Sequence, residues 1–211
     1  MERSVNIIRQ EQGLCGGCHC GPSCFFRRVL LPELPDSEAH TKSRTLHRGE
    51  RIFSQQDSAQ GLYVVKSGSF KSSFSNHEGI EQITAYHFSG DLLGVDSHVS
   101  GRHCVSVTAL ETAAICQLPA TILEASAGSS QVCFSTMMHL MAKQVYERET
   151  HTFVISNCST KQRLAWFLVK IAKSLRARNL DCSTIHLSMS RNDIANYLAM
   201  AIETEIGRAH V

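Results

Sequence analysis

Four cysteines lie within ten positions near the start of the chain, in the stretch GLCGGCHCGPSCFF. Cys15 and Cys18 form a C-x2-C pair, and Cys24 follows after a segment whose Gly-Pro pair allows the chain to reverse direction. Three close thiolates and one distant thiolate are a common ligand set for an iron–sulfur cluster. A tetrahedral zinc site also accepts four sulfurs, and a redox thiol pair or a metal-free structural role is a further alternative. The number of ligands alone does not separate these, although zinc sites often use a second C-x2-C knuckle, which this sequence lacks.

The chain has nine cysteines, so several residues are candidates for a fourth thiolate. Cys20 is near, but only His19 separates it from Cys18, so both thiolates would reach one ion only with strain. Cys116 ends the strand-like run TAAICQLP, and a strand end held by a sheet is a rigid point against which a loop can close. The remaining four have apolar or helical surroundings and are predicted to be small core residues: Cys104, Cys133, Cys158 and Cys182.

The composition is that of a globular chain with a sizeable core. Of 211 residues, 43% are hydrophobic and 19% are charged, and no run reaches the roughly 18 apolar residues of a membrane span. The N-terminus lacks the apolar region of a secretory signal, so we expect a cytoplasmic protein with reduced thiols. An odd number of cysteines then argues against a disulfide framework. The net charge of +2 neither indicates nor excludes a nucleic-acid partner.

Short strand-like runs separated by turn residues occupy about residues 46–120 and would supply the sheet. Such closely spaced runs predict an antiparallel sandwich or barrel. They are RIFS, GLYVVKSGSFKSSFS, EQITAYHF, GDLLGV, CVSVTALE and TAAICQL.

A long helix is predicted from Gln131 to about Ser156, where apolar residues return at helical spacing. Steps of four and three residues define a heptad seam, which could cover the sheet or pack against a second subunit. The length, about 38 Å at 1.5 Å per residue, and a charged residue in the seam favour the subunit contact. The seam residues are Phe134, Met138, Met141, Val145, Arg148 and Thr152.

Two shorter helices with capping boxes follow the long helix. Ser159 with Gln162 caps the first, whose apolar stripe is Leu164, Phe167, Leu168, Ile171 and Leu175. The connection ARNLDCSTIHLSM is predicted to hold one short strand. Ser190 with Asp193 caps the second, whose inward residues are Ile194, Tyr197 and Leu198. After Ala199 and Met200 another helix opens at AIET, which completes the skeleton of a helix-turn-helix.

Seven blocks in a fixed order carry a resemblance to a known family. They are LCGGCHCGPSC, SGSFKS, EQITAYHFSGDLLG, ALETAAICQLP, LMAKQV, RLAWFLV and MSRNDIANYLAMAIET. From about Cys15 to Thr204, the chain resembles the oxygen-sensing FNR regulators of the cyclic-AMP receptor protein (CRP/FNR) superfamily. The family's C-x2-C-x5-C motif, with one cysteine in the ALET…C strand, implies the metal ligands Cys15, Cys18, Cys24 and Cys116. It implies a 4Fe-4S cluster, converted to 2Fe-2S by oxygen, and makes Cys20 a non-ligand.

The resemblance also implies an α+β fold and the function of a transcriptional regulator. The expected domains are a cluster-binding loop at 1–26, an antiparallel β-roll at 27–130, a dimerisation helix at 131–157 and a partial winged helix-turn-helix at 158–204. A homodimer with an intact cluster would bind a two-fold symmetric site on double-stranded DNA and contact RNA polymerase. The implied DNA-binding residues are Ser190, Arg191, Glu203 and Thr204. No nucleophile–base pair is found in a setting typical of catalysis, so we do not expect an enzyme.

Three departures from the family pattern qualify these expectations. EIGRAHV, at 205–211, replaces the rest of the recognition helix and matches one reading frame of a common sequencing adapter, so we expect a non-native tail and a truncated native chain. Arg148 stands near the position where the family commonly has an acidic residue, so two like charges would still meet across a two-fold axis; the alternative is that Arg148 extends to solvent or pairs with Glu147 or Glu149. The stretch GDLLGVDSHVSGRHCVSV lacks the acid–Arg–Ser set that binds a cyclic nucleotide, which makes a nucleotide-responsive regulator the less favoured alternative, beside a zinc or thiol sensor.

Overall fold

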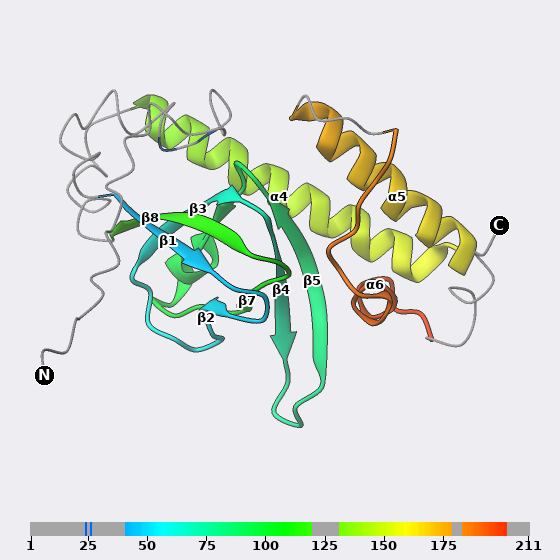
Figure 1. The fold of residues 1–211 in the computed structure, drawn as a ribbon. Coiled ribbons are helices and arrows are strands. Elements are labelled where there is room, and N and C mark those ends of the chain that lie inside the picture. The colour runs from blue at the N-terminus through cyan, green and yellow to red at the C-terminus, as the bar shows by residue number, and fades with distance from the viewer. Residues whose placement is uncertain (1–23, 25, 27–40, 120–130, 179–182, 202–211) are drawn as a thin grey trace, which may run out of the picture.

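The structure is a computed structural model that describes residues 24, 26, 41–119, 131–178 and 183–201. Within these residues, strands come first and helices follow (Figure 1). The strands are β1 (Lys42–Leu46), β2 (Arg51–Phe53), β3 (Gly61–Ser67), β4 (Ser69–Ser75), β5 (Glu81–Phe88), β6 (Leu92–Leu93), β7 (Ser106–Ala109) and β8 (Ala113–Pro119). The helices are the 3-10 helix η4 (Val95–Val99) and the α-helices α4 (Gln131–Asn157), α5 (Thr160–Ala177) and α6 (Arg191–Tyr197).

The strands form two antiparallel sheets, in the orders β1-β8-β3-β6 and β2-β7-β4-β5. This confirms the predicted antiparallel roll, and every strand-like run of the sequence carries at least one of the strands β2–β8. The sequence did not predict β1, because KSRTL is mostly polar and its only fully buried residue is Leu46. The core between the sheets consists of Leu46, Ile52, Phe53, Tyr63, Val65, Phe70, Leu93, Val105, Val107, Ala109, Ala113 and Ile115.

A tight turn at Gly68 joins β3 to β4 and brings the two sheets together. Gly68 has a φ of +76°, and a Cβ added there would lie 2.6 Å from the Cβ of Ala113 in β8. A side chain at this position would therefore both strain the backbone and displace β8.

Helix α4 crosses the described body, with strands beneath its first half and α5 and α6 beside its second half (Figure 1). It begins at Gln131, as predicted, and ends at Asn157. No helix among the described residues is both long and apolar enough to cross a membrane.

Both predicted capping boxes are present, Ser159 with Gln162 on α5 and Ser190 with Asp193 on α6. Each satisfies orphan N–H groups of the first helical turn, which explains why the helices begin there. The inward residues predicted for α6, Ile194, Tyr197 and Leu198, are all buried.

The packing of α5 and its following connection differs from the prediction in two places. Leu168 is 38% exposed, whereas Trp166 packs against the cluster of buried residues beside α5. Helix α5 is thus rotated toward α4, where the Trp166 ring lies near that of His151. The predicted short strand of the connection is absent from its described part, residues 183–189.

The helical segment also packs against the roll. Ile83 and Leu110 of the roll share one buried cluster with the helices. The helical members and their connection residue are Phe167, Ile171, Met189, Ile194, Tyr197 and Leu198. The helix-turn-helix segment and the sheet therefore share a hydrophobic core.

Candidate functional site

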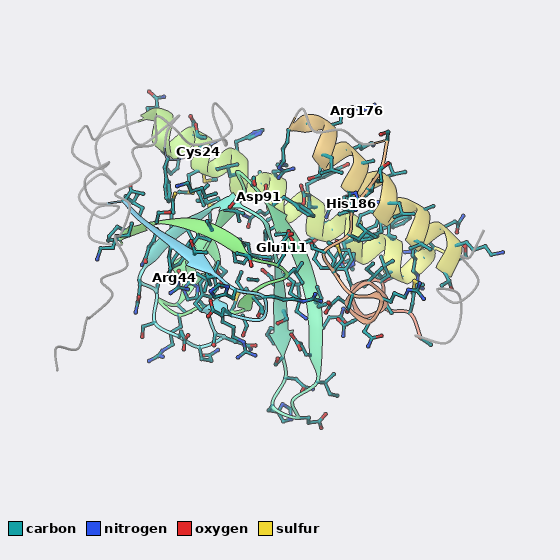
Figure 2. All side chains as sticks on the ribbon, in the orientation of Figure 1. Cys24, Arg44, Asp91, Glu111, Arg176 and His186 are labelled. Carbon is teal, nitrogen blue, oxygen red and sulfur yellow. The ribbon has the colours of Figure 1, made fainter. Side chains whose placement is uncertain are left out.

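Two of the four predicted metal ligands lie in the same small apolar cluster. Cys116 is held in β8 between two strands, opposite Ser43 of β1 and Val64 of β3. Cys24 is buried, and Figure 2 shows it beside the first half of α4. The buried members of the cluster are Cys24, Phe26, Leu62, Val64, Leu92 and Leu118, and Val95, Cys116, Met137 and Leu140 pack against it. The structure thus brings two sulfurs, 92 positions apart in the sequence, to one place under α4.

The other cysteines have different surroundings. Cys15, Cys18 and Cys20 lie outside the described residues, as do the side chain of Cys133 and the whole of Cys182. Cys158 is partly buried. Cys104 is exposed, so the prediction that Cys104 is a core residue was wrong. Partial burial and the neighbouring Asp96 carboxylate raise the pKa of the Cys104 thiol. Among the described residues, no three His, Cys, Asp or Glu side chains form a group that could hold a metal ion.

Helix α4 has one face that is buried against the rest of the chain and another that is exposed. Met137 and Leu140 pack on the cysteine cluster, and further along the same side His151 and Val154 are buried against the helical segment. The predicted seam lies on another side of the helix. Phe134, Met138, Val145, Arg148 and Thr152 are exposed, and Met141 is partly exposed. Tyr146 and Phe153, which the heptad pattern does not include, are 72% and 63% exposed and widen this apolar face.

The predicted DNA-binding residues fall partly within the structure. Ser190 and Arg191 are exposed at the start of α6, whereas Glu203 and Thr204 lie outside the described residues. The Ser190 hydroxyl accepts a hydrogen bond from the Asp193 N–H at 3.0 Å and so is engaged as the helix cap. Arg191, at the first position of α6, extends from the exposed end of that helix.

Polar side chains hold α6 on the edge strand β5. The Asn196 Oδ1 accepts from the Ile83 N–H at 2.6 Å, and its Nδ2 donates to the Glu81 carbonyl at 2.8 Å. Lys71 of β4 forms an ion pair with Asp193 at 2.6 Å. The side-chain amide of Asn196 therefore both accepts from and donates to the β5 backbone, as a neighbouring strand would. Sequence reasoning missed this contact because it joins positions more than 100 residues apart.

Comparison with known proteins identifies the family of this chain. Residues 43–127 match the family model for the cyclic nucleotide-binding domain, and residues 187–208 match that for bacterial regulatory proteins of the crp family. The chain is 31% identical over 205 residues to the transcriptional activator protein Anr of Pseudomonas protegens, a match that covers 97% of this chain and 84% of that protein. It is also 31% identical over 207 residues to the fumarate and nitrate reduction regulatory protein of Escherichia coli K12, with 94% and 82% coverage. The chain belongs to the CRP/FNR family.

The CRP/FNR fold is also seen in solved structures. FixK2 from Bradyrhizobium japonicum superposes with a TM-score of 0.70 at 24% identity, over 77% of this chain and 79% of that one. This likeness confirms the predicted fold class. The relatives named as transcriptional activators and the match to the crp family model make the chain a DNA-binding regulator of transcription.

In this CRP/FNR chain, the loop that follows η4 is already bonded to an anion, the Asp96 carboxylate of η4. The Asp96 carboxylate accepts a hydrogen bond from the Cys104 N–H at 2.8 Å and lies 3.4 Å from the Nδ1 of His103. Burial raises the pKa of Asp96, but these hydrogen bonds outweigh it, and the net pKa is lowered. The His103 ring is buried and stacks on Phe53 at 3.5 Å, whereas Arg102 donates to the Gln56 carbonyl. A nucleotide phosphate would meet an ionised carboxylate here, which disfavours the nucleotide alternative.

Proposed function

We propose that the chain is an oxygen-responsive activator of transcription, in which Cys15, Cys18, Cys24 and Cys116 hold a 4Fe-4S cluster. In this proposal the cluster-bearing chain forms a homodimer through the exposed seam of α4. The dimer binds a two-fold symmetric DNA site through Ser190, Arg191, Glu203 and Thr204, and it contacts RNA polymerase. The proposed domains are those given in the sequence analysis, with the sensor in the roll and the DNA-binding segment after α5.

The presence of Cys24 and Cys116 in one apolar cluster carries this proposal. The two described thiols fit a sulfur ligand set, because they reach the same apolar cluster from the N-terminal segment and from β8. When bound, a 4Fe-4S cluster would supply the sensitivity to oxygen. The apolar side chains of the cluster, Leu62, Val64 and Leu118 among them, bury Cys24 and partly cover Cys116.

The same cluster explains how ligation can affect dimerisation. Met137 and Leu140 of α4 pack against the cysteine cluster. Phe134 and Met138, which lie within one turn of Met137 on the same helix, are exposed on the seam. A helix transmits a rotation of one face directly to the other, because its backbone hydrogen bonds hold it as a unit. Tethering Cys24 to Cys116 therefore supports one orientation of the seam.

The test is the metal content of protein purified without oxygen. We expect roughly four irons and four acid-labile sulfides per chain and a broad absorbance near 400 nm that bleaches in air. Cys116→Ala should lose most of the iron and the colour, because the strand-borne ligand is removed.

Cys104→Ala and Cys158→Ala are the matched controls, since neither residue packs on the cysteine cluster, and both should keep the iron. A colourless wild-type protein containing zinc would replace this proposal with the zinc alternative. A Cys116→Ala protein as rich in iron as the wild type would overturn the ligand set.

A further inference from the structure

The turn that follows α6 is held from outside by two other helices. Three successive backbone carbonyls at this turn, those of Tyr197, Leu198 and Ala199, accept side-chain hydrogen bonds. The Nε2 of His151 lies 2.8 Å from the Tyr197 oxygen. The Nη1 of Arg163 donates to the Leu198 oxygen at 3.1 Å and to the Ala199 oxygen at 2.9 Å. These are the carbonyls that a helix end leaves unsatisfied, so the partners decide where the turn lies.

His151 belongs to α4, the helix of the exposed seam. Its ring is buried and stacks almost parallel on Tyr197, with centroids 4.1 Å apart, and on Trp166 of α5 at 5.8 Å. The next residue, Thr152, is exposed on the seam. One turn of α4 thus presents the seam on one side and the support of the α6 turn on the other. Burial lowers the pKa of His151, and this effect together with the nearby Lys170 outweighs the hydrogen bond to the Tyr197 carbonyl, which raises it. Because a carbonyl oxygen only accepts, the ring donates to it through Nε2–H.

Arg163 ties the same turn to the junction between α4 and α5. Its Nε donates to the carbonyl of Cys158 at 2.9 Å, in the residue pair that connects the two helices. One guanidinium therefore joins the end of α4 to the end of α6 with three hydrogen bonds, in the planar fork geometry that only arginine offers.

We propose that His151 and Arg163 are positioning residues, which fix the turn after α6 relative to the seam of α4 and so pass a change in α4 to the DNA-reading segment. This proposal rests on the proposed function only for the meaning of the reading segment; the mechanical link itself stands on the contacts above. Neither residue carried a signal in the sequence, since a histidine and an arginine on helices are most often solvated.

The link can be measured by hydrogen–deuterium exchange on the full chain. His151→Phe keeps a flat ring against Tyr197 and Trp166 but removes the donor to the Tyr197 carbonyl. His151→Gln restores a donor without the ring, and His139→Phe changes an exposed histidine of the same helix.

We expect His151→Phe to speed the exchange of the Leu198, Ala199 and Met200 amides about tenfold, since their bonds close this turn. Amides of the roll core, such as Val107, should be unchanged. His151→Gln should be closer to the wild type, and His139→Phe should match it. Equal acceleration everywhere would mean a general structural role, and no acceleration at the turn would mean that His151 does not hold it; either result overturns the proposal.

Arg163→Met provides a second variant that keeps the aliphatic stem, with Lys161→Met as its control on the same helix. In Arg163→Met, exchange of the Leu198, Ala199 and Met200 amides should also rise about tenfold, and exchange of the roll amides should not change. The proposed function is decided by a separate measurement, the iron and acid-labile sulfide content of the wild type purified without oxygen. If the wild type holds no cluster, the proposed function fails, whereas the exchange result still decides this proposal.

Discussion

At the scale of single residues, Ala199 carries an unfavourable backbone conformation. It has a φ of +49°, the left-handed region in which a Cβ is strained. Its N–H and carbonyl are both hydrogen-bonded, so the turn is held despite the strain.

Ala199→Gly should therefore raise the free energy of unfolding by about 0.5–1 kcal/mol, the relief of strain less the greater freedom of glycine in the unfolded chain. Urea unfolding followed by circular dichroism measures this. The same change at Ala165, an exposed position in the interior of α5, should instead destabilise by about 1 kcal/mol. A loss of stability at position 199 would show that the turn needs the alanine methyl group.

His87 should make stability depend on pH. It lies on β5 with its Nε2 2.6 Å from the Ser72 hydroxyl, and burial lowers its pKa to about 4, with a further contribution from Lys170. The unfolded chain takes up this proton near pH 6.5 and the folded chain only near pH 4. Stability is thus fully present above pH 6.5 and is lost as the pH falls toward 4, by up to about 3 kcal/mol.

His87→Gln removes this titration while keeping a partner for Ser72. Its unfolding free energy, measured in urea at several pH values, should fall less steeply between pH 6.5 and 4 than that of the wild type. His77→Gln, on the turn between β4 and β5, should leave the slope unchanged. Identical slopes for His87→Gln and the wild type would contradict the assignment of the pH dependence to His87.

At the scale of elements, the contact between α6 and the sheet is polar at its rim and apolar at its centre. The Lys71–Asp193 pair is mostly removed from solvent, and burial raises the pKa of Asp193 less than Lys71 and the Ser190 groups lower it. The contribution of this pair is present above about pH 4 and is lost as the pH falls through the lowered pKa.

Lys71→Met should lower the free energy of unfolding by about 1 kcal/mol, because Asp193 keeps its hydrogen bonds within the cap. The effect should shrink in 1 M salt, since the Debye length there is only about 3 Å. Lys161→Met, at an exposed site of α5, should change stability little. A salt-independent loss would point to packing by the lysine stem rather than to its charge.

Comparison of the predicted and observed elements shows which parts of the fold the sequence alone could predict. Strands β2–β8 and both capping boxes could be predicted, because alternation and cap spacing are local signals. The polar edge strand β1 and the rotation of α5 that exposes Leu168 could not, since each depends on the partner that the element meets. For the site, the spacing of the cysteines pointed to ligands, but only the fold brings Cys24 to Cys116. The holders of the α6 turn, His151 and Arg163, gave no local signal at all.

At the scale of the whole molecule, α4 packs on two regions of the chain that are distant from each other in the sequence. Its first half touches the cysteine cluster, its second half touches the aromatic group of Trp166 and Tyr197, and its remaining side is exposed and apolar (Figure 1). An exposed face with two phenylalanines and a tyrosine is costly in water, which is typical of a surface that another subunit covers. Regulation then requires only that this face be barely sufficient for dimerisation.

Arg148 is positioned to weaken dimerisation through this face. It is exposed on the seam, and within the described part of the chain it makes no ion pair, because Glu147 is turned toward Lys170 at 3.4 Å. Across a two-fold axis two such charges repel by about 1–4 kcal/mol, depending on how much water remains between them. Arg148→Ala removes this repulsion and should strengthen the dimer even when the protein is handled in air.

Sedimentation velocity in air, over a range of chain concentrations, measures the prediction. The wild type should sediment as a monomer, and Arg148→Ala should shift to the dimer at concentrations at least about fivefold lower, the factor that 1 kcal/mol represents. Lys143→Ala, which removes an exposed positive charge about half a turn away from the seam, should behave as the wild type. A strictly monomeric Arg148→Ala would mean that the two arginines do not face each other, and that the seam alone is too weak to hold two chains without the cysteine-bound group.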